Sequence, residues 1–176
     1  MGPNAWLAQP VELDKHLGGV INSLRERGEF MGDELETLLI IPPEGSIKAK
    51  ALLLIGLGDE ATLSLEKMER VGKVALREAS NLGAQRVAFA PLIRDQGNAK
   101  LGTGDIAAAV LRGVLLANDT QHRMQQQGLG KAFTLKEWTE EAGPAYFDET
   151  TAALQKQVKQ VESIIATRVK TPYKTK

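Results

Sequence analysis

The chain has 176 residues, enough for one domain with a substantial apolar core. Lys plus Arg and Asp plus Glu number 22 each, and this zero net charge argues against non-specific nucleic-acid binding, which needs a basic excess. The absence of cysteine excludes disulfide frameworks and thiolate metal sites, and no apolar run reaches the ~18 residues of a membrane span. The opening "MGPNAWLAQP" lacks the basic and apolar regions of a signal peptide, so we expect a cytoplasmic protein.

The first 60 residues predict a helix and two strands. Apolar residues recur at helical spacing from Leu13 to Leu24. Gly18 and Gly19 interrupt this pattern and cost about 1 kcal/mol each inside a helix. Either they allow a close contact, or the helix starts after them. Two apolar runs, 35–41 and 51–57, then predict strands, and their short connection allows antiparallel pairing.

The rest of the chain alternates helices with strands. The pattern predicts helices over 64–82, 105–119 and 145–168 and strands over 86–92 and 131–138, with a basic tail or linker at 169–176. This alternation favours an α/β fold with a mixed, mostly parallel sheet flanked by helices. The last helix carries an apolar stripe that could serve assembly or pack within the domain: Leu154, Val158, Val161 and Ile165.

Two glycine loops raise the question of phosphate binding. Gly56 and Gly58 match the G-x-G-x-x-A spacing, but the next helix starts several residues later and Asp59 and Glu60 would repel phosphate. We therefore interpret this loop as a sharp strand exit.

The second glycine loop opens a buried helix. Its residues are Gly102, Thr103, Gly104 and Asp105. Free amides at a helix start attract anions, and glycine lets a ligand approach the backbone. An ordinary helix start capped by Thr103 or Asp105 is the favoured alternative, since Asp105 could itself fill the anion position.

Other chemical signals are few. His16 and His122 are expected to be surface helix residues. No catalytic motif and no metal-ligand spacing appears, so we expect neither a metal nor a cofactor. The acidic pairs Glu12 with Asp14 and Glu140 with Glu141 are expected to be solvated charges.

Ordered motifs indicate a family. Residues 10–95 carry Leu13-Asp14 with Leu17-Gly18-Gly19, then Gly28-Glu29-Phe30 with Gly32, then the strand exit from Leu53 to Gly58. This order resembles the N-terminal domain of the leucine (cytosol) aminopeptidases. The resemblance implies a three-layer, macro-domain-like α/β fold over residues 1–168, with peptidase chemistry confined to a separate two-metal domain.

The signature of that catalytic domain, N-T-D-A-E-G-R-L, does not occur in this sequence. The resemblance therefore implies a non-catalytic module with an assembly or regulatory role. Its partners would be a homo-oligomer or an aminopeptidase catalytic domain, without nucleic acid or membrane.

The macro-domain likeness implies an alternative function. The chain would then be a stand-alone domain that binds ADP-ribose or a related nucleotide or phosphate ligand. The residues implied are Asn4 and Trp6 in the first loop with Gly102, Thr103, Gly104 and Asp105 in the second.

Overall fold

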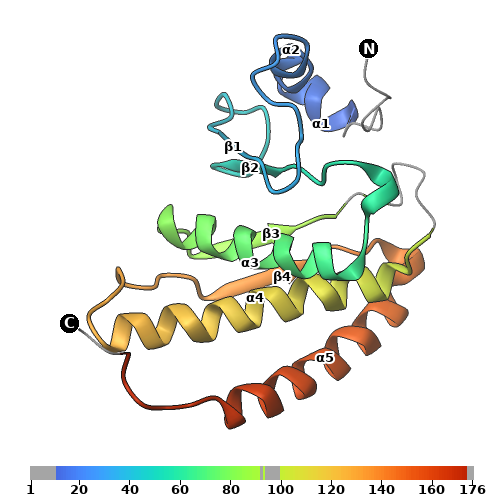
Figure 1. Ribbon diagram of the computed structural model, residues 1–176. Helices are drawn as coiled ribbons and strands as arrows, with labels where there is room; N and C mark the ends of the chain where they lie inside the picture. Colours follow the sequence, from blue (N-terminus) through green and yellow to red (C-terminus); the bar gives the residue numbers. More distant parts are fainter. Residues whose placement is uncertain (1–10, 92, 94–99, 174–176) are drawn as a thin grey trace. The chain divides into compact units, whose positions relative to one another are not determined.

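The computed structural model describes residues 11–91, 93 and 100–173, shown in Figure 1. The chain divides into two compact units, one of residues 1–67 and 92–100 and another of residues 68–91 and 101–176. None of the helices in the described ranges is long and apolar enough to cross a membrane.

The first unit begins with two short helices, α1 (Val11–His16) and α2 (Val20–Glu26). Gly18 and Gly19 separate them, with φ of 70° and 82°. Glycine enters this left-handed region without the steric cost that other residues meet. A helix does start after the two glycines, as in the second alternative from the sequence, but a separate helix, α1, precedes them.

Asp14 joins the two helices. Its carboxylate accepts hydrogen bonds from the backbone amides of Ile21 (2.8 Å) and Asn22 (3.3 Å), and the residue is only 2% exposed. A carboxylate that accepts amides at a helix start stabilises that start. The expectation of a solvated charge is thus wrong for Asp14, whereas the Glu12 side chain is 79% exposed.

The strands of the first unit are β1 (Thr37–Ile40) and β2 (Leu52–Ile55). They pair antiparallel, with Thr37 opposite Ile55 and Ile40 opposite Leu52, as the short connection predicts. The β2 residues are half-buried and Ala51 is exposed, so this run is less enclosed than its unbroken apolar sequence suggests. A short 3-10 helix (Glu60–Thr62) follows.

The second unit contains a strand–helix–strand–helix sequence that follows α3 (Leu65–Asn81). Its elements are β3 (Arg86–Phe89), α4 (Thr103–Gln126), β4 (Glu137–Glu140), a 3-10 turn (Pro144–Tyr146) and α5 (Phe147–Thr167). β3 and β4 pair in parallel, with Arg86 opposite Glu137. Parallel strands need a crossover connection of a dozen or more residues, and α4 lies in that connection.

Two predicted boundaries in this unit are wrong. The helix expected over 105–119 extends from Thr103 to Gln126. The strand expected over 131–138 lies instead at Glu137–Glu140, because the amides of Lys136 and Glu137 both donate to the Gln85 carbonyl and start the parallel ladder there. Cross-strand pairing thus decides the start of β4.

Helix α5 packs along α4. The two helices run in the same direction, since Gly104 meets Glu149 and Ala153 near their starts and Asp119 meets Arg168 near their ends. In the α5 stripe Val161 is buried, while Leu154, Val158 and Ile165 are half-buried. The stripe is therefore largely covered within its own unit.

Helices α3 and α4 cross at two glycines. A Cβ atom added to Gly72 would lie 2.2 Å from the Val110 carbonyl oxygen, and one added to Gly113 would lie 2.0 Å from the Glu69 carbonyl oxygen. Each glycine thus admits the backbone of the other helix. Beside this crossing, the Glu69 carboxylate forms ion pairs with Lys73 (2.5 Å) and Arg112 (2.9 Å). Buried residues on both helices surround the crossing: Met68, Val71, Ala75, Leu76, Ile106, Ala109, Val110 and Val114.

These observations show an α/β protein. In the described residues the strands form one antiparallel pair and one parallel pair. These two pairs do not establish one sheet within a three-layer fold. The three-layer arrangement and the single domain over 1–168 therefore stay predictions.

We predict that Gly113→Ala destabilises the protein. Alanine improves helix propensity by about 1 kcal/mol. However, its methyl group would overlap the Glu69 backbone, and overpacking costs about 1–3 kcal/mol or more. Urea unfolding should therefore show a net loss of stability. Gly130→Ala is the control, because only ordinary contacts surround that glycine. Equal stability of the two variants would contradict the tight crossing.

Candidate functional site

The Gly56–Gly58 loop is packed against the protein's own backbone. A Cβ atom at Gly56 would lie 2.1 Å from the Asp33 carbonyl oxygen, and Gly58 (φ 68°) would place one 3.2 Å from Glu34. The Gly58 amide also donates to the Gly32 carbonyl over 2.9 Å. These glycines allow two chain segments to touch at the exit of β2.

Two charged side chains hold this contact in place. The Glu36 carboxylate accepts the amides of Gly32 (2.6 Å) and Asp33 (3.0 Å). The Lys67 ammonium, 2% exposed, donates to the Leu57 carbonyl (2.9 Å) and the Thr62 hydroxyl (2.6 Å), and its ion pair is with Glu34 at 3.2 Å. A buried ammonium needs such partners to offset its desolvation. The loop is thus a bonded structural turn.

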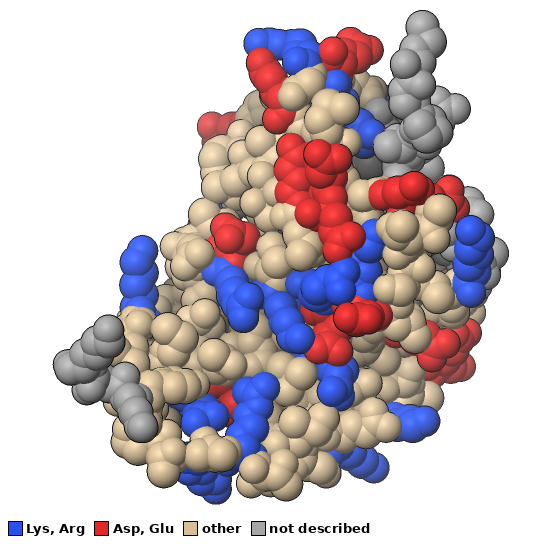
Figure 2. Space-filling model, in the orientation of Figure 1, with Lys and Arg blue, Asp and Glu red and all other residues tan. Residues whose placement is uncertain are grey.

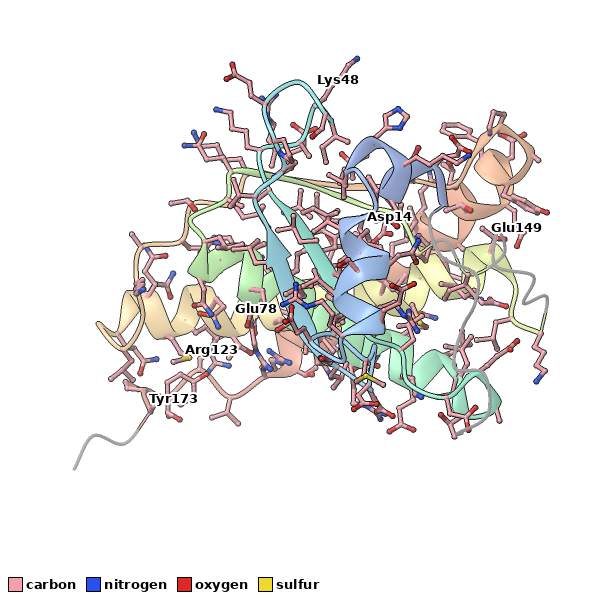
Figure 3. All side chains as sticks on the ribbon, turned by 90° about the horizontal axis from the view of Figure 1, so that it is seen from above. Asp14, Lys48, Glu78, Arg123, Glu149 and Tyr173 are labelled. Atoms are coloured by element: carbon pink, nitrogen blue, oxygen red, sulfur yellow. The ribbon has the colours of Figure 1, made fainter. Side chains whose placement is uncertain are left out.

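The second glycine loop forms the start of α4, as predicted. Gly102 is the residue before the helix, and no side chain of its own caps it. Instead, the Gly104 amide donates to the Glu149 carboxylate of α5 over 3.1 Å. Glu149 is labelled in Figure 3. This carboxylate occupies the position that favours an anion at a helix start.

The predicted ligand residues are only partly brought together. Gly102, Thr103, Gly104 and Asp105 are consecutive at the start of α4, while Asn4 and Trp6 lie outside the described residues. The Thr103 hydroxyl is buried without a hydrogen-bond partner among the described residues, and Asp105 is exposed, so neither supplies the expected cap. An external anion would have to displace Glu149, and the ligand site stays a prediction.

Sequence reasoning gave no signal for Glu149. It lies in the acidic first turn of α5, where carboxylates are common on any helix. Its contact with Gly104 spans 45 residues and depends on the parallel packing of α4 and α5.

Glu140 on β4 is a half-buried residue whose carboxyl group has one oxygen, Oε2, out of contact with solvent. Its Oε1 accepts a hydrogen bond from the Trp138 indole N–H over 2.7 Å, and its Oε2 is buried without a partner among the described residues. Burial raises the pKa of Glu140 to about 7, against the opposing effect of the Trp138 hydrogen bond. Trp138 stacks on Phe89 of β3, with ring centroids 5.9 Å apart.

The expectation of a solvated Glu140 is therefore wrong. Alternate residues of a strand share one face, so Glu140 shares its face with Trp138. The alternation in "EWTE", residues 137–140, thus indicates from the sequence that Glu140 lies on the same strand face as Trp138.

The two histidines are exposed helix residues, as expected. His16 bonds to the Glu12 carbonyl oxygen of its own helix, and His122 lies against Phe133 at 4.5 Å. Across the described ranges, no group of three or more His, Asp or Glu side chains could hold a metal ion.

Comparison with known proteins identifies the family. The profile of the cytosol aminopeptidase family, N-terminal domain, matches residues 3–128. The chain belongs to this family. Its resemblance to the leucine aminopeptidases is thus confirmed, and the matched range contains both glycine loops.

Individual relatives carry the name of the same family. A probable cytosol aminopeptidase of Roseiflexus castenholzii is 33% identical over 106 residues, which are 60% of this chain and 20% of that protein. A probable cytosol aminopeptidase of Thermosynechococcus vestitus is 28% identical over 158 residues, or 89% of this chain and 30% of the relative. The chain therefore spans only 20% to 30% of the length of these relatives.

A solved structure supports the fold. A mutant of tomato leucine aminopeptidase aligns with a TM-score of 0.61 and 18% identity, over 89% of this chain and 29% of that chain. The fold thus resembles part of an aminopeptidase of this family. These relatives give no support to the ADP-ribose alternative.

We predict that Glu149→Ala in this cytosol aminopeptidase family domain lowers the free energy of unfolding by about 1 kcal/mol, as loss of a helix cap does. The physical reason is the unpaired Gly104 amide and the lost charge at the α4 start. Glu162→Ala is the matched control, because Glu162 is an exposed residue of the same helix. Chemical denaturation measures both, and equal losses would show that the Glu149 contact contributes nothing.

The raised pKa of Glu140 predicts a pH-dependent stability. A carboxyl whose folded pKa is about 7 and whose ordinary value is 4.5 favours the folded state below pH 4.5. That contribution is lost as the pH rises through 7, and its full size is on the order of 3 kcal/mol at 1.36 kcal/mol per pKa unit. Glu140→Gln should remove this dependence and be the more stable protein at pH 8.5.

The measurement is urea unfolding at pH 5, 7 and 8.5, followed by tryptophan fluorescence. The difference between Glu140→Gln and the wild type should grow with pH. Parallel stability curves for the two proteins would contradict a buried, titrating carboxyl group.

Proposed function

We propose that this chain is a non-catalytic module of the cytosol aminopeptidase family that acts in assembly or regulation. The observation that carries the proposal is the extent of the match. The N-terminal domain profile covers residues 3–128, while the chain spans only 20% to 30% of its relatives' length. The part of the family that this chain contains is therefore the part outside the catalytic domain implied by the resemblance.

The chemistry of the described residues supports this proposal. Two-metal hydrolysis needs carboxylates that converge on ions ~3.5–4 Å apart. Four acidic side chains among the described residues have partners within the chain: Asp14, Glu36 and Glu149 accept backbone amides, and Glu69 pairs with Lys73 and Arg112. No metal-holding group occurs in the described part of the chain. These four acidic residues thus stabilise the fold.

The proposed partner is an aminopeptidase catalytic domain or a second copy of this chain, in the cytoplasm. The relatives are named cytosol aminopeptidases, which supports both the partner and the location. The α5 stripe is largely covered by its own unit, so other surfaces would make this contact. Exposed apolar side chains in the described residues offer such surfaces: Met31, Leu39, Ile41, Leu82, Leu129, Phe147 and Val169.

We predict that the purified chain does not hydrolyse leucyl-p-nitroanilide in the presence of manganese, zinc or magnesium. The reason is that no metal ligands converge among the residues that the structure describes. The positive control is a full-length cytosol aminopeptidase under the same conditions. Metal-dependent turnover that co-elutes with this chain and is lost with EDTA would overturn the non-catalytic proposal.

A further inference from the structure

A hollow of about 280 Å³ lies at the carboxyl ends of α4 and α5, within the second unit. Its lining residues are Asp119, Arg123, Gln126, Gln127, Ile165, Arg168 and Lys170. Its volume lies below the 300–1,000 Å³ of pockets for drug-sized ligands, so the space suits a smaller molecule.

The lining carries three cationic side chains and one carboxylate. Asp119 is already neutralised, because its carboxylate pairs with the Arg168 guanidinium at 2.5 Å. Arg168 also approaches the Leu116 carbonyl oxygen and the Thr120 hydroxyl, both at 3.4 Å. This pair ties the end of α5 to α4, and among the described lining residues no second carboxylate balances the charges of Arg123 and Lys170.

Arg123 is held in position but keeps donors to spare. One guanidinium nitrogen donates to the Val169 carbonyl oxygen, and the guanidinium lies over the Tyr173 ring, 5.4 Å from its centroid. Figure 3 shows Arg123 and Tyr173 at the same end of the molecule. An arginine has five N–H donors in a fixed fork, so several remain for another partner.

Lys170 and Gln127 supply further donors. Lys170 makes no hydrogen bond or ion pair with any described residue, and it is exposed. The Gln127 side-chain oxygen accepts the Tyr173 amide over 2.7 Å, which leaves the Gln127 NH₂ group to donate. Figure 2 shows basic side chains gathered at the lower left of the visible face. The helix ends themselves carry partial negative charge, which offsets only part of this positive charge.

We infer that this hollow binds a small oxyanion, a phosphate or a carboxylate, between Arg123 and Lys170. The Arg123 fork would hold two oxygens of the anion, as guanidinium groups do with such ligands. The Lys170 ammonium would add a second charge, and the glutamine NH₂ groups would complete the donor set. Ile165 lines the same space and would provide an apolar contact for a short apolar group on a carboxylate.

The test is calorimetric titration of the whole chain with inorganic phosphate and, separately, with malonate, at constant ionic strength set with KCl. We expect saturable binding of at least one of the two, and the tighter one identifies the class of ligand. Lys170→Gln should raise its Kd at least tenfold. This substitution disturbs no contact with a described residue, so it leaves the melting temperature without ligand unchanged.

Lys159→Gln is the matched control, because Lys159 is an exposed α5 residue outside the hollow. It should bind as the wild type does. Arg123→Gln should lose binding as well. The inference is overturned if neither anion binds the wild type, or if Lys170→Gln and Lys159→Gln bind with the same Kd.

Discussion

The close crossing of α3 and α4 is the constraint on which the second unit depends. Gly72 and Gly113 let each helix backbone enter the space that the other helix's side chain would fill. Protein interiors are packed so tightly that such an approach fixes the relative position of two helices. Helix α4 then serves as the support for α5, whose Glu149 reaches the α4 start and whose Arg168 reaches Asp119 near the α4 end.

Close packing at glycines also explains why the two glycine loops, which suggest ligand binding, have structural roles here. Glycines at 56 and 58 admit the Gly32–Glu34 backbone, and Gly104 admits Glu149 and Ala153. The Gly104 amide has the Glu149 carboxylate as its partner, and the amides of Gly56 and Gly58 donate to backbone carbonyls of the chain. A family domain built in this way uses its glycines and acids for packing, which agrees with an assembly or regulatory role.

Much of the fold could be predicted from the sequence, because local periodicity and turn residues determine it. Most of the helices and the β1–β2 hairpin follow from such local signals, which left the effect of Gly18 and Gly19 open between two alternatives. The start of β4, the cap from Glu149 and the glycine crossing could not be predicted, since each depends on a partner far away in the chain. The burial of Asp14 and of the Glu140 carboxyl group could not be predicted either, because it depends on tertiary neighbours. Only the shared strand face of Trp138 and Glu140 follows from the sequence.

The most direct test of the assembly role is sedimentation velocity of this chain mixed with an aminopeptidase catalytic domain that lacks its own N-terminal domain. The Roseiflexus castenholzii relative, 33% identical over the aligned region, is a suitable source of that domain. We predict a boundary that contains both proteins and sediments faster than either protein alone. Independent sedimentation of the two proteins at all concentrations, with this chain remaining a monomer, would contradict it.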